Sequence, residues 1–413
     1  MKKVIISLLV AGAVAAANAQ DKALLETLVK KGMLTQQEAA QIAKDSVAVT
    51  PATKSTKSIK IFGGAQGWYS WGKNSVKSGS EIFGQQNGFT LRYVKLGIEA
   101  DVGGGWSAEV VTDFGTEGAS KNYLDKVVAS KKIDLDYING TLQLGLRKVN
   151  MGYEQNMDDF GQLAVERSVA TYFFTRYDGK NFGSRTVGVF WDGNITQVDG
   201  LYYGAAVTSG VSEGGVDNYI TEAQDSSALS FWANMGYKNV ADVKGETLSY
   251  DLGINFGYAP QGMNDDIRYT KKGSVWGINP YATLNWRGLT LIGEFFLQQA
   301  EDYTPGRNGV GRTPMGANFT AAYKMDIGEW GAIEPVFRGS YVSTNGMGLR
   351  SAYSGDDLGD INQAMTFYGG VNWYATTAVK TSLGYEFAYY DQGDSDVERV
   401  YGNTVWAQVQ VLF

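Results

Sequence analysis

Because this chain of 413 residues contains no histidine and no cysteine, its charged side chains are carboxylates, amines and guanidiniums. Without histidine there is no Ser–His triad, no imidazole acid–base catalyst and no His-rich metal site. Without cysteine, disulfides contribute nothing to stability. We therefore predict that the chain is not an enzyme, and we predict neither a cofactor nor metal ligands.

Charged residues of both signs are concentrated between residues 150 and 183 and at the two ends of that segment. The basic set is Lys148, Arg167, Arg176, Lys180 and Arg185, and the acidic set is Glu154, Asp158, Asp159, Glu166 and Asp178. Five cations with five anions do not form the ladder of Lys and Arg that would concentrate anions by a focused positive potential. Two interpretations stay open: the charges line a common space of mixed polarity, or each one solvates a polar wall or pairs with a neighbour.

The elements that must position these charges are strands, because from residue 59 onward the apolar residues recur with period two. We predict about sixteen strands, at 59–71, 89–102, 105–115, 132–138, 141–149, 184–192, 200–208, 227–239, 246–259, 276–287, 288–298, 316–327, 331–343, 363–374, 378–391 and 401–413. Long polar links such as 150–183 alternate with short ones such as 287–288, which is typical of a barrel with loops at one end and turns at the other. A propeller or a sandwich, the alternative, would not sort its links by length in this way.

The two faces of these strands differ in polarity. Leu252, Ile254 and Phe256 alternate with Asp251 and Asn255, and the final strand repeats this pattern up to residue 413. The same parity places a mixed set of charges on the inner face: Lys95, Arg147, Lys324, Arg338 and Lys380 with Glu99, Glu109, Asp113, Asp251, Glu294 and Glu386. A sandwich core would need a partner for each of these charges, whereas a water-filled lumen needs none.

The predicted fold class is therefore all-β, a transmembrane antiparallel barrel of sixteen strands. We expect the last strand to pair with the strand that begins near Ile59, because closure removes both apolar edges.

The N-terminal residues differ from the rest of the chain. Lys2 and Lys3, an apolar run and Ala17–Ala19 predict a cleaved signal peptide over 1–19, and hence export to the outer membrane. Residues 20–58 predict a short periplasmic helical segment followed by a Ser/Thr-rich linker, and 59–413 the barrel. Removal of the two lysines leaves 34 basic and 43 acidic residues, a net charge of −9, which argues against a nucleic-acid partner.

Several stretches spread over most of the barrel resemble the outer-membrane porin O/P family, which is named for its phosphate-selective members. They are Gly88–Glu99 with Gly103–Trp106, Leu144–Lys148, Val165–Ser168 and Gly370–Tyr374. The resemblance implies a sixteen-stranded homotrimeric channel whose third loop folds inward. It also implies anion preference in the named members, which the mixed charges of this chain do not support.

The function that we expect is passive diffusion of small hydrophilic solutes or ions through an outer-membrane porin in contact with membrane lipid and lipopolysaccharide. The third loop, 150–183, would form the constriction, since a long loop rich in aromatic residues and charges can pack against an inner wall. The constriction candidates are Lys95, Glu109, Arg147, Lys148, Glu154, Asp158, Asp159, Glu166, Arg167, Arg176, Lys180, Glu294 and Arg338. The alternative is a structural tether in which residues 20–58 bind cell wall or periplasmic partners and the barrel serves only as an anchor.

Overall fold

The computed structural model describes residues 57–76, 83–115, 124–176, 182–183, 185–209, 229–263, 273–301, 311–345, 362–391 and 400–413. The predicted signal peptide and helical segment lie outside these residues. The strands are β1 (Ser58–Val76), β2 (Phe83–Gly103), β3 (Trp106–Asp113), β4 (Leu124–Asp134), β5 (Ile138–Lys148), β6 (Arg185–Ile195), β7 (Leu201–Thr208), β8 (Ser230–Val243), β9 (Glu246–Met263), β10 (Gly273–Trp286), β11 (Leu289–Glu301), β12 (Gly311–Arg312), β13 (Met315–Tyr323), β14 (Met325–Asp326), β15 (Ala332–Ser343), β16 (Gln363–Tyr374), β17 (Val379–Asp391) and β18 (Val400–Leu412).

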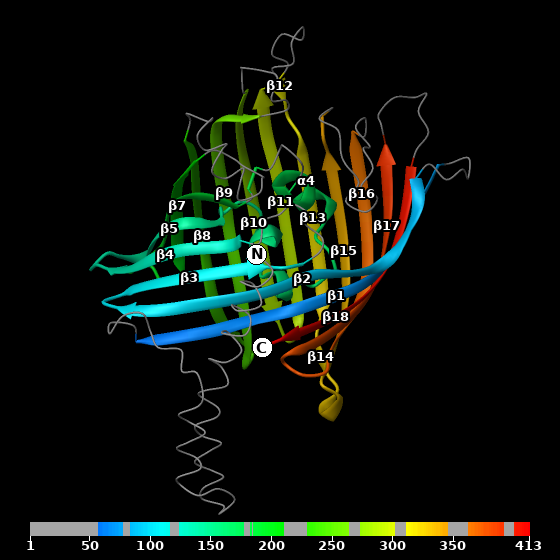
Figure 1. Cartoon of the computed structure of the whole chain (residues 1–413), viewed down its shortest axis with the longest axis horizontal. Helices are drawn as coiled ribbons and strands as arrows, with labels where there is room; N and C mark the ends of the chain where they lie inside the picture. Colours follow the sequence, from blue (N-terminus) through cyan, green and yellow to red (C-terminus); the bar gives the residue numbers. More distant parts are fainter. Residues whose placement is uncertain are drawn as a thin grey trace, which may run out of the picture.

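These strands form one closed antiparallel barrel (Figure 1). β12, β13 and β14 together occupy one position in the barrel, between β11 and β15. Counted as one interrupted strand, they give a barrel of sixteen strands. The barrel closes where β18 pairs with β1, from Gly64 opposite Leu412 to Val76 opposite Val400. The predicted fold class and the pairing of the last strand with the first are confirmed.

The outer surface of the barrel is apolar and its inner surface is polar, as the period-two pattern predicts. Leu252, Ile254 and Phe256 on β9 are 51%, 41% and 41% exposed, whereas Asn255 between them is 4% exposed. On β18, Val409 and Val411 are exposed and Gln408 and Gln410 are buried. An apolar surface that surrounds the whole barrel has no favourable place in water and suits the hydrocarbon of a bilayer.

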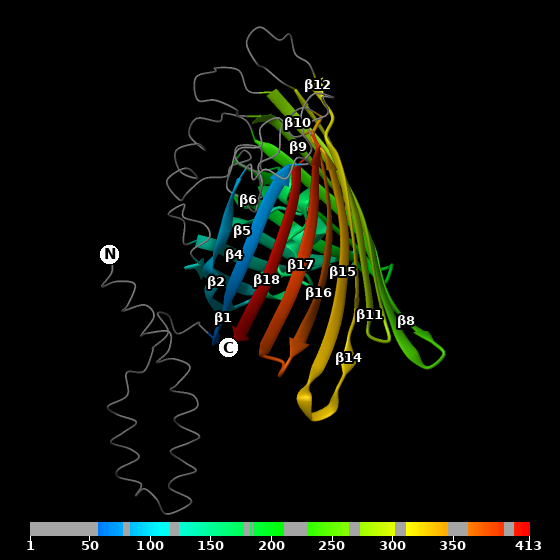
Figure 2. The same ribbon diagram turned by 90° about the vertical axis from the view of Figure 1, so that its right-hand side faces the viewer.

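Tight turns join the strands at the end of the barrel where the C-terminus lies (Figure 2). In the turn between β8 and β9, Lys244 and Gly245 have φ of 58° and 79°, and in the turn between β10 and β11, Arg287 and Gly288 have 51° and 82°. Two consecutive positive φ values fit the two-residue hairpin whose twist matches that of the strands. A Cβ atom on Gly288 would lie 2.4 Å from the Lys324 carbonyl oxygen, so glycine is required there.

The fourth strand is the clearest error of the sequence-based assignment. The prediction placed it at 132–138 with a turn at 138–140, but β4 runs from Leu124 to Asp134 and β5 already begins at Ile138. The turn is formed by residues 135–137. The stretch Lys131–Asp136 holds four charged residues and alternates poorly, so the pattern did not distinguish the end of the strand from the turn.

The described part of the connection between β5 and β6 contains three short helices: α3 (Tyr153–Asn156), η1 (Asp159–Gly161) and α4 (Val169–Arg176). α4 lies within the outline of the barrel in Figure 1 and packs against the inner faces of β13, β15 and β16. Among the residues described, no helix has the length and apolar character needed to cross a membrane.

Candidate functional site

The third loop lies inside the barrel, where the start of α3 is hydrogen-bonded to β10 and β11. Glu294 on β11 accepts hydrogen bonds from the backbone N–H groups of Tyr153 (2.7 Å) and Glu154 (3.2 Å), the first two residues of α3. Asn279 on β10 accepts from the Gly152 N–H (3.1 Å) and donates to the Glu294 carboxylate (3.0 Å). The N–H groups at the start of a helix have no acceptor within the helix, and Glu294 and Asn279 of the barrel wall supply these acceptors for α3.

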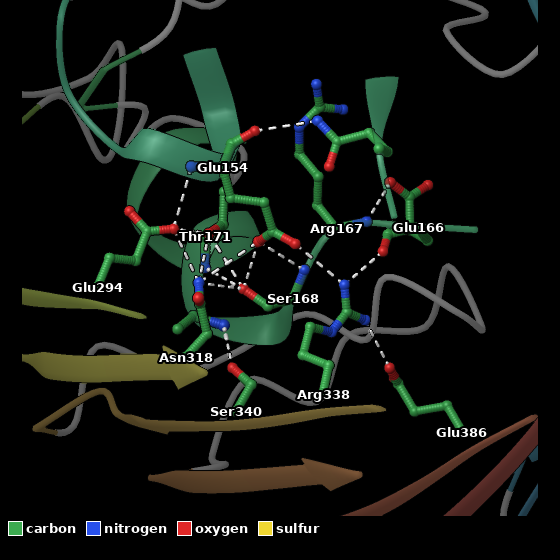
Figure 3. A network of polar contacts seen from close by, with 12 residues as sticks. Glu154, Glu166, Arg167, Ser168, Thr171, Glu294, Asn318, Arg338, Ser340 and Glu386 are labelled. Atoms are coloured by element: carbon green, nitrogen blue, oxygen red, sulfur yellow. Dashed lines mark hydrogen bonds and ion pairs between the residues drawn. The ribbon is translucent and has the colours of Figure 1, made fainter. Parts of the chain in front are cut away.

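A second set of contacts binds the middle of the loop to β13, β15 and β17 (Figure 3). The Glu154 carboxylate accepts from Ser168 Oγ (2.7 Å) and from Arg338 Nη1 (3.0 Å). Arg338, which is 1% exposed, also donates to Glu386 Oε2 (2.8 Å) and to the Glu166 carbonyl (2.5 Å). A guanidinium with several fixed acceptors holds its partners in one geometry, so Arg338 joins both sides of the loop to the wall.

Asp159 is the centre of a third set, at the opposite wall. Its carboxylate contacts Lys95 and Arg167 directly, and lies 3.3 Å from Lys148 Nζ and 3.8 Å from Arg185 Nη2. Although burial opposes ionisation, these four cations hold the pKa of Asp159 well below its usual range. Burial opposes the charge of Arg167 as well, but Tyr93, Asp159 and Glu166 raise the pKa of that guanidinium above its usual value.

The C-terminal part of the loop is held by apolar contacts that the period-two pattern did not predict. The rings of Phe174 on α4 and Phe296 on β11 are stacked with centroids 4.9 Å apart, and Phe182 lies 4.9 Å from Trp232 on β8. Around them is a buried apolar cluster: Val149, Met151, Val169, Ala170, Phe173, Phe190, Ala259, Val275, Ala300, Val342, Ala364, Ala388, Tyr390 and Val400. Part of the barrel interior is therefore a packed core.

Cavities lie beside the loop, and two of them have distinct lining residues. The first, of about 770 Å³, lies against β1–β6, with Phe62 and Phe413 near its turn end. It is lined by five basic residues, Lys95, Lys126, Arg147, Lys148 and Arg185, and by five acidic ones, Glu109, Asp125, Asp158, Asp159 and Asp192. The second, of about 920 Å³, lies against β5–β10 and is lined mainly by amides and hydroxyls.

The predicted site residues fall into distinct groups. Lys95, Lys148, Asp159 and Arg167 meet in one cluster, and Glu154, Glu166, Glu294 and Arg338 in the network of Figure 3. Glu109, Arg147 and Asp158 line the first cavity. Arg176 is the last residue of α4, and Lys180 lies outside the residues described. In the residues described, no group of acidic side chains is arranged to hold a metal ion.

Sequence reasoning missed several charged residues of the site, among them Arg92, Asp125, Lys126 and Asp192. Asp125 and Lys126 precede the predicted fourth strand, and Arg92 and Asp125 lie at β-bulges. The register of β1 and β2 skips Arg92, since Gln66 lies opposite Tyr93 and Gly67 opposite Leu91. Asp125 is skipped in the same way between β3 and β4. At a bulge two residues of one strand lie opposite a single residue of its partner, which interrupts the alternation of side chains between the two faces of the sheet. Arg92 thus reaches Glu166 (2.7 Å), and Asp125 reaches Lys95 (3.0 Å).

No family model and no curated protein matches this sequence. Solved structures do match. The fold is that of the outer-membrane porins. OprB of Pseudomonas putida aligns with 86% of this chain and 94% of its own at a TM-score of 0.57 and 10% identity. The outer-membrane channel DcaP of Acinetobacter baumannii aligns with 87% and 99% at 0.56 and 9% identity. OmpF of Salmonella typhi aligns with 87% and 100% at 0.51 and 14% identity. Membership of the porin O/P family stays a prediction.

Proposed function

We propose that this chain is an outer-membrane porin, a water-filled channel through which small hydrophilic solutes or ions diffuse passively. The observation that supports it most is the inversion of polarity across the wall, with exposed apolar side chains outside and charged or amide side chains inside. In a bilayer this arrangement satisfies the backbone within the barrel and keeps water in the lumen. No catalytic step is part of the proposal.

We propose further that the third loop forms the constriction and that the candidate residues divide into two roles. Glu154, Glu166, Arg167, Glu294 and Arg338 are all less than 10% exposed, so they serve to fix the loop in place. Lys95, Glu109, Arg147, Lys148, Asp158 and Asp159 line the first cavity, so they are the charges that a permeating ion would meet. Two of them, Lys95 and Asp159, are also less than 10% exposed and are paired with each other, so they have both roles. Channel selectivity depends on such charges and on the width that the loop leaves.

The assembly that we propose is a homotrimer in contact with outer-membrane lipid and lipopolysaccharide. β3 and β7 have eight residues each, whereas β8–β10 have 14 to 18. At about 3.3 Å per residue and a tilt of about 45°, eight residues rise by roughly 19 Å, less than the apolar band of about 25 Å. A wall that is too short for the bilayer suits a contact with another copy. The mass of the detergent-solubilised protein, measured by light scattering, tests this.

Liposome swelling tests the channel itself. Vesicles that carry the refolded protein should swell in isosmotic solutions of small uncharged solutes, at rates that fall steeply as the solute grows. Arg147→Ala, which shortens a cavity-lining side chain, should raise the rate for larger solutes. Vesicles that contain correctly folded protein and do not swell in any solute would overturn the proposal.

A further inference from the structure

The second cavity differs chemically from the first. Its charged side chains are Lys238, Asp199 and Asp251, and the remaining polar ones are neutral amides and hydroxyls. We call its lumen side the amide face: Asn139, Asn194, Ser249, Thr283 and Asn285, with Tyr153 of the third loop. Adjacent strands lie about 4.8 Å apart. The hydrogen-bonding groups therefore lie on two pairs of neighbouring strands, β5 with β6 and β9 with β10, which β7 and β8 separate.

Aromatic rings lie against the wall next to the amide face. Tyr202 on β7 is opposite Gly236 in the register, and Tyr281 on β10 is opposite Gly253. A Cβ atom on Gly236 would lie 2.2 Å from the Tyr202 hydroxyl, and one on Gly253 would lie 2.5 Å from Tyr281 Cζ. Each ring therefore covers a glycine, which only the absence of a side chain permits, and lies along the wall.

Hydrogen bonds and ring contacts fix these tyrosines. The Tyr202 hydroxyl donates to Asp251 Oδ1 (2.7 Å) and contacts the Tyr281 hydroxyl. The ring of Tyr153 lies 4.9 Å from that of Tyr281 at an interplanar angle of 36°, so the third loop completes the group. The result is a preorganised aromatic surface beside the amide face, which lowers the entropic cost of holding a ligand.

We propose that the amide face and its tyrosines are a binding subsite for an uncharged, polyhydroxylated solute, such as a small sugar. Amides and hydroxyls both donate and accept, as sugar hydroxyls do, and the carbon-bound hydrogens of a sugar suit an aromatic ring. A single lysine beside two aspartates gives an anion no net attraction. The inference rests on the proposed function, since only a channel would give such a solute access to the lumen.

The test uses sucrose as the uncharged probe and gluconate as a charged polyhydroxylated control, added to the full-length protein in planar bilayers. Sucrose should reduce the ion current with a saturating dose dependence, and gluconate should not. The double variant Asn194→Ala/Asn285→Ala removes two exposed amides and should raise the half-saturating concentration at least about fivefold, as expected for lost hydrogen bonds. Gln143→Ala, an amide of the first cavity, should leave that concentration unchanged.

Two results would contradict the proposal that the amide face and its tyrosines bind sugars. One is a reduction of current that is linear in sucrose and equal in all three proteins, which indicates viscosity alone. The other is a half-saturating concentration that rises as much in Gln143→Ala as in the double variant. Saturation-transfer NMR on the solubilised protein separates failure of the subsite from failure of the channel. Transfer to sucrose that the double variant loses supports the subsite even without currents, and no transfer in the unaltered protein contradicts it.

Discussion

At the scale of single residues, Asp159 carries the largest share of charge pairing in the site. It is 3% exposed and is surrounded by four cations, so removal of its charge would leave those cations without their common partner. Breaking a buried ion pair from one side typically costs about 3–5 kcal/mol.

We therefore predict that Asp159→Asn lowers the thermal unfolding temperature of the detergent-solubilised protein and loosens the third loop. The neighbouring Asp158→Asn is the control. The exposed Asp158 side chain accepts a hydrogen bond from the Phe160 N–H at 3.3 Å and has a Coulombic interaction with Lys380, so its replacement should change the free energy of unfolding by less than about 1 kcal/mol. Equal shifts in the two variants would show that Asp159 is not a special anchor.

The depressed pKa of Asp159 also fixes the direction of the pH dependence. A carboxylate whose pKa is lowered in the folded state contributes stability that is complete above its unfolded value of about 3.9 and is lost as the pH falls through the folded value. The docking of the loop, followed by tryptophan fluorescence, should therefore be constant from neutral pH to about 4 and change only below that. A transition near pH 6 that Asp159→Asn removes would contradict this account.

At the scale of elements, regular alternation was predictable and its interruptions were not. The outer residues of β9 and β18 followed from period two, because lipid requires an apolar side chain at every second position. The bulges at Arg92 and Asp125 cannot be recognised from that pattern, although both residues contribute charges to the site. The buried aromatic residues of α4 could be expected to pack against the wall, but the sequence did not show which strands would receive them.

The turns give a test at this scale. Gly288→Ala should lower the unfolding temperature, because alanine at φ 82° is strained by about 1–2 kcal/mol and its Cβ would clash with the Lys324 carbonyl. Gly369→Ala on β16 is the matched control, because a Cβ there meets no atom within 4 Å. A larger loss in Gly369→Ala would contradict the turn assignment.

The third loop gives another test. Replacement of Val169–Arg176 by a short Gly-Ser link removes α4 and its contacts with β13, β15 and β16. If the loop forms the constriction, single-channel conductance should rise on the order of twofold, because the narrowest section controls the current. An unchanged conductance in a correctly folded barrel would place the constriction elsewhere.

At the scale of the whole molecule, the first and second cavities differ in chemistry although they lie in the same barrel. The first balances five basic with five acidic residues, so we predict weak ion selectivity. The reversal potential in a tenfold KCl gradient should lie close to zero. A potential near the limit for a pure anion channel would contradict the mixed lumen and favour the behaviour that the phosphate-selective members of the porin O/P family imply.

The central claim, a continuous water-filled channel, is tested most directly by conductance of the purified full-length protein in planar bilayers. We predict discrete current steps that grow with KCl concentration and occur in multiples, as expected for insertion of a trimer. Protein that inserts as a folded barrel and gives no steps at any voltage would contradict it.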